Sequence, residues 1–417
     1  MNTKKEHHFA FLDGVRGLGA IIVILNHYVS AYFPVLTRSK GLAHYGWEAS
    51  LTNSPAFFVL DGPLFLYLFF LTSGFVLTGT YIREAGVTGQ VLKRAIRLFL
   101  PCLVSCLIAL VLLYLLPSVQ AQITPDTRSI WAERLYANPM TALSLAKDVL
   151  LNVPFLGYQG ASPFDPIDAW AKGALLSPVT TSLNPPLWTM SIEFWGSMLV
   201  LLLARLYRAW PRSWFWVAFA ASFLVVGTSY LSLFLVGFAS YVLLYQPASQ
   251  NFPKAPWIGI LLGLGVILVS GWTPSLDTFL QVARRICLLN APVSFVLHTE
   301  ILAILLFAGI LITPGLRHIL GSRPAVWLGQ RSFALYLVHF PLLFTVDFTL
   351  FAALRPFLSY EAAVALSMII GMGLSVILSI PFERWIDRPA RHLASRIAHS
   401  LSGPAHPHET LAAEPLP

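Results

Sequence analysis

Long runs of apolar residues, separated by shorter polar connections, dominate the pattern of this 417-residue chain. A helix needs about 20 mostly apolar residues to cross the hydrocarbon core of a bilayer. Runs of this kind predict about ten membrane-spanning helices, give or take one. We place them at residues 10–33, 61–82, 97–117, 185–205, 213–228, 230–246, 256–272, 291–313, 326–352 and 360–383. The two runs that meet near Thr228 also fit one long bent segment. The expected fold class is an all-α polytopic membrane protein.

Lysines and arginines are distributed unevenly between alternate connections. With the N-terminus in the cytoplasm, the connections expected inside contain most of them: Lys4, Lys5, Arg83, Lys93, Arg94, Arg97, Arg205, Arg208, Arg212, Arg317, Arg323, Arg331, Arg384, Arg388, Arg391 and Arg396. The short outer connections contain few. Because cytoplasmic loops carry an excess of Lys and Arg, this asymmetry predicts both termini in the cytoplasm and an even number of spans.

One outer connection, residues 118–184, is much longer than the others and is rich in Pro, Ser, Thr and Asp. Within it, residues 141–153 are mildly amphipathic, which fits either a lid on the outer interface or a plain solvated connection. The tail, residues 398–417, is rich in Pro, Ala and His, and we expect it to be disordered. The domain prediction is therefore a single transmembrane domain over residues 1–397.

Composition narrows the class of protein. Hydrophobic residues make up 56% of the chain and charged residues 11%, whereas soluble domains carry about 25% charged residues. The net charge of +8 is divided among many short loops, which argues against nucleic-acid binding. The three cysteines have no metal or disulfide spacing, so we expect no bound metal.

Ionisable residues inside membrane helices are costly and usually face a protein interior or a watery cavity. The first span contains Arg16 and His27, which are eleven residues, or about three turns, apart and so share a face. Asp13 is placed to pair with Arg16, and Asn26 precedes the histidine. Arg16 suits a phosphate or an oxyanion, and His27 suits a general base. The alternatives are a snorkelling arginine and a histidine that only bonds between helices.

Two further elements lie in the second and third spans. Ser73 and Gly74 permit close helix packing, which is the favoured interpretation of this pair. Arg94 and Arg97 share a face at the cytoplasmic end of the third span. They fit an anionic ligand such as a nucleotide, or ordinary positive-inside charge.

The fourth and ninth predicted spans add the remaining candidates. Trp188 fits an outer interfacial belt, Ser191 follows it, and Glu193 falls about a third of the way across the span. A lone carboxylate there needs a partner, either His27 or an arginine. Tyr336 and His339 lie three apart on one face, where a satisfied structural histidine is the simpler interpretation.

These elements, in this order, resemble the membrane acyltransferase-3 family over nearly the whole chain. The most specific mark is Asp-Gly-x-Arg-Gly at residues 13–17, followed by His27. Further support comes from Ser-Gly-Phe at 73–75, Arg94 and Arg97, Trp188 with Ser191 and Glu193, Tyr336 to His339, and Glu383. Two positions depart from the family pattern: Met190, where a smaller residue or Leu is common, and Phe194, which replaces a frequent second acidic residue.

The resemblance implies transfer of an acyl group, often acetyl, from acyl-coenzyme A to a hydroxyl of a sugar, cell-surface glycan or lipid-linked acceptor. In that interpretation His27 is the general base, and Arg16, Arg94 and Arg97 meet the coenzyme A phosphates. Glu193 orients His27, and Ser73 lies in the donor site. Acyl-CoA is then a co-substrate, with no tightly bound cofactor, and the expected location is a bacterial inner membrane.

Two alternatives belong to other functional classes. A transporter or exporter of a glycan or lipid intermediate would use His27, Glu193 and His339 as a proton relay. A membrane scaffold or sensor gives no reason for Arg16 and His27 to share a face.

Overall fold

The chain folds into a bundle of α-helices, seen in a computed structural model that describes residues 9–83, 86–116, 119–136, 141–227, 229–245, 251–272 and 296–401. Within these ranges there is no β-strand, only isolated bridges at Tyr158. The helical fold class expected from the apolar runs is thus confirmed. The rest of the expected disordered tail, residues 402–417, lies outside the described part of the chain, and the last helix continues to Leu401.

Six helical segments are long and apolar enough to cross a membrane. They are Ala10–Tyr32 (α1), Gly62–Arg83 (α3), Val87–Leu115 (α4), Pro185–Ala209 (which contains α9, Trp188–Ala209), Arg323–Leu354 (α16, Arg323–Leu342, to α17, Phe348–Leu354) and Tyr360–Ala398 (α18, Tyr360–Phe382, into α19, Arg388–Leu401). A seventh candidate is α14 (Leu297–Ile312) with α15 (Pro314–Leu320), bent by 95°.

The ten predicted spans all coincide with apolar helices over their described residues, but not all have the length of a span. Three helices, α10 (Arg212–Val226), α11 (Tyr230–Leu244) and α12 (Pro256–Ser270), have 15 residues each. At about 1.5 Å per residue they fall short of a 30 Å core. By length and composition, the described residues supply six or seven candidate spans, so the predicted count of ten is not confirmed.

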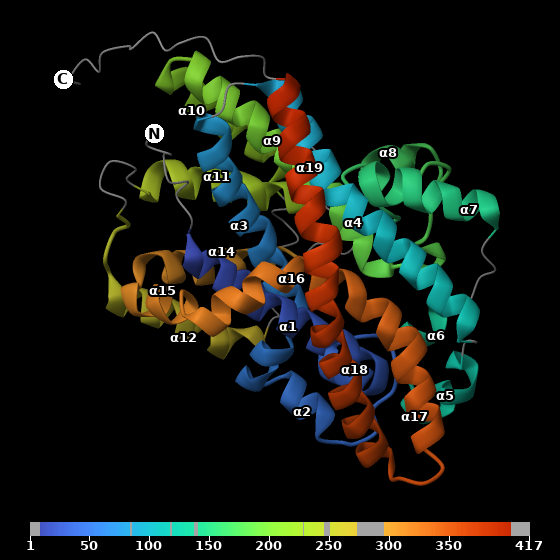
Figure 1. Ribbon diagram of the computed structural model, residues 1–417. Helices are drawn as coiled ribbons and strands as arrows, with labels where there is room; N and C mark the ends of the chain where they lie inside the picture. The colour runs from blue at the N-terminus through green and yellow to red at the C-terminus, as the bar shows by residue number, and fades with distance from the viewer. Residues whose placement is uncertain are drawn as a thin grey trace.

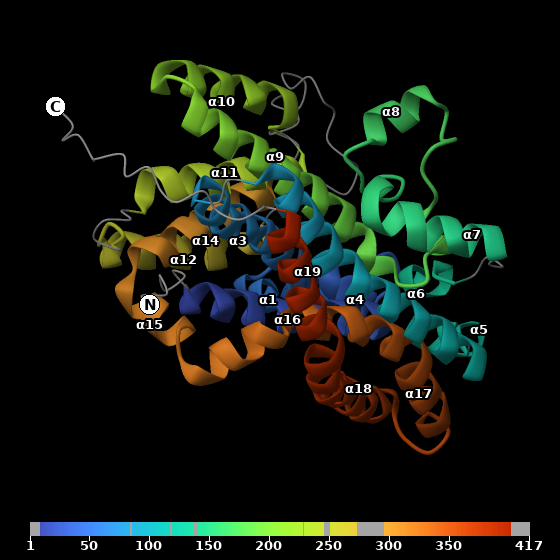
Figure 2. The ribbon, with the colours of Figure 1, turned by 45° about the horizontal axis from the view of Figure 1, so that its top comes forward.

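Helices α1 and α16 pack backbone to backbone (Figures 1 and 2). A Cβ atom added to Gly17 would lie 2.6 Å from the Gly329 nitrogen, and one added to Gly329 would lie 2.0 Å from the Asp13 carbonyl oxygen. The glycines of the first span therefore make room for a neighbouring helix and not for a ligand. Small residues allow this approach in membranes, where close packing drives helix association.

Substituting Gly329→Ala should separate α1 from α16 and lower the free energy of unfolding by about 1–3 kcal/mol. Thermal unfolding of the detergent-purified protein measures this. Gly373→Ala is the matched control, because nothing lies within 4 Å of its added Cβ and alanine is the better helix former. Equal melting temperatures for the two variants would show that α1 and α16 can move apart at this contact without loss of stability.

The long outer connection folds into short helices: α5 (Gln120–Thr127), α6 (Ile130–Arg134), α7 (Ala142–Lys147), a π-helical segment Asp148–Leu156 and α8 (Asp165–Trp170). The amphipathic stretch 141–153 becomes α7 and the start of the π-helical segment. The ring of Phe155 packs on Phe194 at 5.6 Å, which holds this segment against α9. The connection is therefore neither structureless nor simply solvated.

The Asp148 carboxylate fixes this connection from inside. It accepts hydrogen bonds from the Tyr158 hydroxyl at 2.5 Å and the Leu183 backbone nitrogen at 2.9 Å. Burial raises the pKa of the Asp148 carboxyl, and these hydrogen bonds, with that of Ser182, oppose the rise. Because a buried carboxylate needs such partners, Asp148 closes residues 148–183 into one unit.

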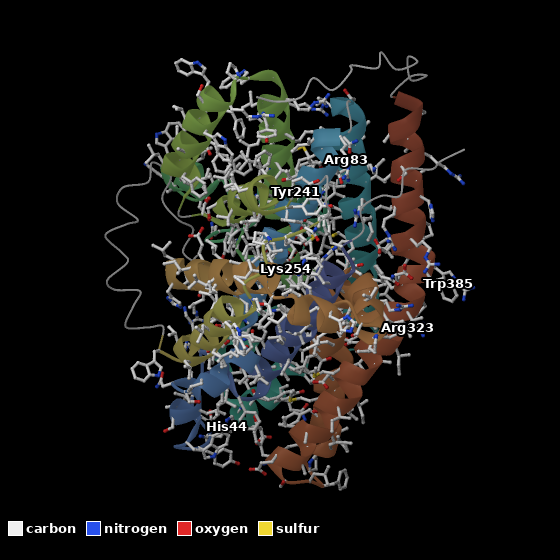
Figure 3. The ribbon with its side chains drawn as sticks, turned by 90° about the vertical axis from the view of Figure 1, so that its left-hand side faces the viewer. His44, Arg83, Tyr241, Lys254, Arg323 and Trp385 are labelled. Atoms are coloured by element: carbon white, nitrogen blue, oxygen red, sulfur yellow. The ribbon has the colours of Figure 1, made fainter. Side chains whose placement is uncertain are left out.

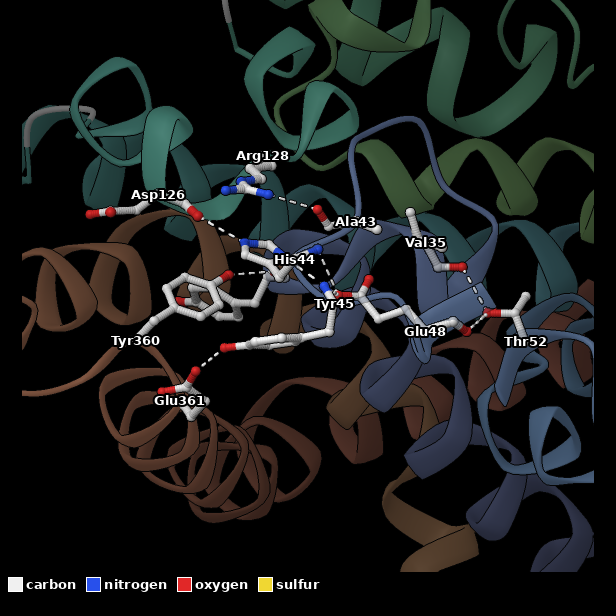
Figure 4. Close-up of polar contacts among 11 residues, drawn as sticks. Val35, Ala43, His44, Tyr45, Glu48, Thr52, Asp126, Arg128, Tyr360 and Glu361 are labelled. Carbon is white, nitrogen blue, oxygen red and sulfur yellow. Dashed lines mark hydrogen bonds and ion pairs between the residues drawn. The ribbon is translucent and has the colours of Figure 1, made fainter. Parts of the chain in front are cut away.

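Figure 3 shows Arg83 near one end of the bundle and His44 near the other. At the His44 end, polar contacts join the α1–α3 connection to the outer helices (Figure 4). The His44 Nε2 atom donates to the Asp126 carbonyl at 2.9 Å, Arg128 donates to the Ala43 carbonyl at 2.7 Å, and Tyr45 bonds Glu361 of α18. This clamp fixes α5 and α6 over the end of α1.

Candidate active site

A cavity of about 2190 Å³ opens among the ends of α1, α3, α4, α15 and α19. The exposed Arg83 lies at its rim, at the end of the bundle opposite His44 (Figure 3). Seven of the residues singled out in the sequence line it: Asp13, Arg16, Ser73, Arg94, Arg97, Glu193 and Tyr336. Residues far apart in the chain thus meet around one space.

The charged lining is mostly cationic. Eight arginines and lysines face four carboxylates: Arg16, Arg83, Lys93, Arg94, Arg97, Arg317, Arg388 and Arg391 against Asp13, Glu193, Glu383 and Asp387. Several of these charges neutralise one another. Glu383 bonds Arg388 at 3.0 Å and Arg391 at 2.8 Å. An excess of cations in an enclosed space attracts an anionic ligand.

Besides the exposed Arg83, three guanidinium groups in the lining have no carboxylate partner within ion-pair distance in the described part of the chain: Arg16, Arg97 and Arg317. The Nε atoms of Arg16 and Arg317 are buried without a hydrogen-bond acceptor. Arg317 lies over the Phe252 ring at 4.9 Å. Buried donors without acceptors are costly in a folded protein, so these groups are available to an anion in the cavity.

Arg94 is occupied differently from Arg97. Its guanidinium forms an ion pair with Glu193 and its Nε donates to Ser197 at 2.7 Å. Ser73 also donates to Glu193, at 2.7 Å. Of the two partners expected for Glu193, the arginine is the one in contact. The expectation that Glu193 orients His27 is therefore corrected. The Glu193 carboxylate instead bonds Arg94 of α4 and Ser73 of α3, both of which lie beside α9.

His27 pairs with His339 of α16. The His27 Nδ1 and His339 Nε2 atoms are 2.9 Å apart, and the rings are parallel within 1°. The His339 Nδ1 atom lies 2.8 Å from the Tyr336 carbonyl oxygen, which only accepts. A neutral His339 therefore donates from Nδ1 and accepts at Nε2, so His27 donates from its Nδ1. This assignment leaves the His27 Nε2 lone pair free to take a proton.

The histidine pair lies beyond the closed end of the cavity. Val23 lines the cavity and His27, one turn further along α1, does not; four residues correspond to about 6 Å along the helix. On α16 Tyr336 lines the cavity, and its ring lies 5.8 Å from that of His339. Arg16 and His27 thus flank one path, but only Arg16 borders the cavity, which corrects the expectation of a shared space.

The Tyr336 hydroxyl marks this closed end. It lies 2.9 Å from the Thr189 hydroxyl and donates to the Pro186 carbonyl. That carbonyl belongs to the 3-10 turn Pro185–Leu187 that precedes α9, and it also accepts from the Thr189 hydroxyl at 3.1 Å. Tyr336 therefore contacts both the cavity and His339.

The remaining candidates stabilise the surroundings. Asn26 donates to the Leu60 carbonyl at 2.7 Å. Ser191 donates to the Trp188 carbonyl at 3.2 Å, and Trp188 packs on Tyr230 at 5.2 Å. The expected Asp13–Arg16 ion pair is not found between these two described residues, although both line the cavity.

Two parts of the site were not foreseen. Arg317, Arg388 and Arg391 read in sequence as ordinary charges at cytoplasmic helix ends, and Glu383 entered only as a family mark near the end of the last span. They enter the lining because α15 bends back and α19 continues along α4, as both ribbon views show (Figures 1 and 2). The i,i+4 spacing of Asp387 and Arg391, which form an ion pair at 3.3 Å, was the only local signal.

Comparison with known families agrees with this geometry. A family profile described as an acyltransferase domain matches residues 9–384. No curated protein and no solved structure matches the chain significantly. The profile covers the histidine pair and every helix that lines the cavity except α19, so the chain belongs to the acyltransferase-3 family and is a membrane acyltransferase.

Proposed function

We propose that this protein transfers an acyl group from acyl-coenzyme A to a hydroxyl of a sugar, glycan or lipid-linked acceptor, with His27 as the general base. The observation that carries the proposal is a cationic cavity that ends one helical turn from a histidine with a free ring nitrogen. Coenzyme A is an anionic molecule with a long, thin arm. Such a cavity suits its phosphates at the wide end and its thioester at the narrow end.

The donor side follows from charge. The helix ends that give the cavity its cations belong to connections that the Lys and Arg distribution assigns to the cytoplasm. Coenzyme A is a cytoplasmic compound. Arg16, Arg97 and Arg317, which lack carboxylate partners, are the groups we assign to its phosphates. Arg94, which is paired with Glu193, is assigned to holding α4 against α9.

The chemical step uses the histidine pair. The His27 Nε2 atom takes the proton of the acceptor hydroxyl as its oxygen attacks the thioester carbonyl. The tetrahedral intermediate then expels the coenzyme A thiolate, which receives that proton from His27. His339 accepts the His27 Nδ1 proton in a hydrogen bond throughout, and so fixes the tautomer, a role similar to that of the third residue in a hydrolase triad.

The acceptor reaches His27 from the other end of the bundle. His27 is partly exposed although it does not line the donor cavity. Trp131 of the outer connection stacks on the imidazole and is also only partly buried, so we assign the acceptor to that side. This arrangement supports transfer of the acyl group from a cytoplasmic donor to an acceptor on the opposite face.

Two measurements test the function. Coenzyme A should raise the melting temperature of the purified protein, because a ligand of the folded state stabilises it. Mass spectrometry of surface polysaccharides and lipids should reveal one acyl group that is missing in cells without the protein. Proton-driven flux of a glycan or lipid, with no stabilisation by coenzyme A, would instead favour a transporter.

Arg97→Gln should weaken coenzyme A binding about tenfold, since one charge-assisted hydrogen bond to a phosphate is worth about 1.5–3 kcal/mol. Titration calorimetry with unacylated coenzyme A measures this without turnover. Arg212→Gln is the control, because Arg212 lies over Tyr207 at 3.7 Å and outside the cavity lining. Equal affinities of the two variants would remove Arg97 from the donor site.

A further inference from the structure

His27 is partly exposed, and its ring stacks on that of Trp131 of α6, in the long outer connection. Three rings outside α1 pack around the imidazole: His339, Phe340 and Trp131. His339 and Phe340 are buried, at 0% and 1% exposure, whereas Trp131 is only partly buried. The indole is therefore the least buried of the three rings in contact with the imidazole.

The orientation of the two rings is specific. The indole and imidazole planes are within 11° of parallel, with centroids 6.1 Å apart. A flat group that lies against the indole is consequently parallel to the imidazole as well.

The indole is also held in place from several directions. Ser129 caps α6 at the Ala132 nitrogen and donates to the Ser30 carbonyl of α1 at 2.7 Å, one turn beyond His27. The Trp131 backbone nitrogen donates to the Lys40 carbonyl at 2.8 Å. Gln120 donates to the Leu135 carbonyl at 2.7 Å. A binding surface fixed in advance loses less entropy when it takes a ligand.

The surroundings indicate the chemistry of that ligand. The neighbouring residues Lys40, Arg128, Glu133 and Arg134 are exposed, so this end of α6 faces water and not lipid. An indole face is large and apolar. The ligand that matches both is a ring with an apolar face and hydroxyl groups on its rim, which describes a pyranose.

We propose that Trp131 is the platform on which a pyranose acceptor stacks, presenting a rim hydroxyl to His27. This inference rests on the proposed acyl-CoA-dependent transfer and assigns its acceptor class and a specificity-determining residue. A lipid alcohol or an open-chain polyol would gain little from a flat indole. The reaction remains the one described above: the sugar oxygen gains the acyl group, and coenzyme A leaves with the proton.

The test uses the full-length protein in detergent with radiolabelled acetyl-CoA. The acceptors are the methyl glycosides of glucose, galactose, mannose and N-acetylglucosamine, with glycerol as the open-chain comparison. We expect transfer to at least one methyl glycoside in preference to glycerol. Trp131→Ala should raise the KM for that glycoside on the order of tenfold, from the loss of one aromatic stacking contact, while Trp131→Phe retains most of the affinity.

The matched control is Trp170→Ala, because Trp170 lies in the same outer connection and is 86% exposed. Coenzyme A binding should be unchanged in all three variants, which shows that they fold. An unchanged glycoside KM in Trp131→Ala overturns the platform, as does a wild type that acylates glycerol but no glycoside. A wild type that binds no coenzyme A would instead count against the proposed function itself.

Discussion

His27→Ala is expected to reduce acyl transfer by a factor of 10² to 10⁴, the usual contribution of a general base, and to leave coenzyme A binding intact. The reason is geometric. The imidazole lies one turn beyond the cavity lining, so its loss removes the proton acceptor but none of the groups assigned to the donor. Initial rates with radiolabelled acetyl-CoA, compared with calorimetry on the same preparation, separate the two effects.

His339 provides the companion experiment. His339→Gln keeps an oxygen that can accept the His27 Nδ1 proton, whereas His339→Leu keeps only the volume. We expect the leucine variant to lose more activity, because His27 is then free to adopt the tautomer that blocks Nε2. Transfer by His27→Ala at the wild-type rate would remove the base assignment, and equal rates in the two His339 variants would remove the positioning role.

The helical pattern was readable from sequence because lipid imposes it. A membrane segment must pair its backbone within itself, so apolar runs such as residues 97–117 and 360–383 locate helices directly. The predicted ends of these helices were less accurate. Helix α4 begins ten residues before the predicted start because Lys93, Arg94 and Arg97 face a protein cavity instead of water, and such charges break the apolar run without ending the helix.

The candidate site was predictable only as a set of residues. Helical spacing placed Arg16 with His27, and Tyr336 with His339, each pair on one face. It gave no information on which faces meet, and His27 and His339 are 312 positions apart. The pairing of Glu193 with Arg94 over His27 depends on how α9 packs against α4, which is a tertiary property. The family resemblance identified the candidate residues, whereas the helix packing determined which of them are in contact.

Trp131 could not be predicted from the sequence for a different reason. Short outer helices carry no long apolar run, so nothing in residues 118–184 identified one indole among the polar residues. Its place over His27 depends on the Ser129 bond to α1 and on the His44 clamp. Both contacts join segments about 80 to 100 residues apart, beyond the reach of local periodicity.

Breaking the Arg94–Glu193 pair should have the largest effect on stability. The two side chains are only 8% and 12% exposed, and removing one partner of such a pair leaves the other charge buried. The expected loss for Arg94→Gln is about 3–5 kcal/mol of unfolding free energy. Glu193→Gln should cost a similar amount, because the Arg94 guanidinium then stays buried without a negative partner.

The decisive variant removes both charges. In the double substitution Arg94→Met with Glu193→Met, no buried charge is left without a partner, so much of the lost stability should return. A double-mutant cycle by denaturant unfolding in micelles gives the coupling energy. Arg97→Gln is the internal control, since it removes the same charge one turn away without orphaning a carboxylate. If Arg94→Gln and Arg97→Gln unfold at the same denaturant concentration, the ion pair does not hold α4 against α9, and both arginines are then free to serve the donor.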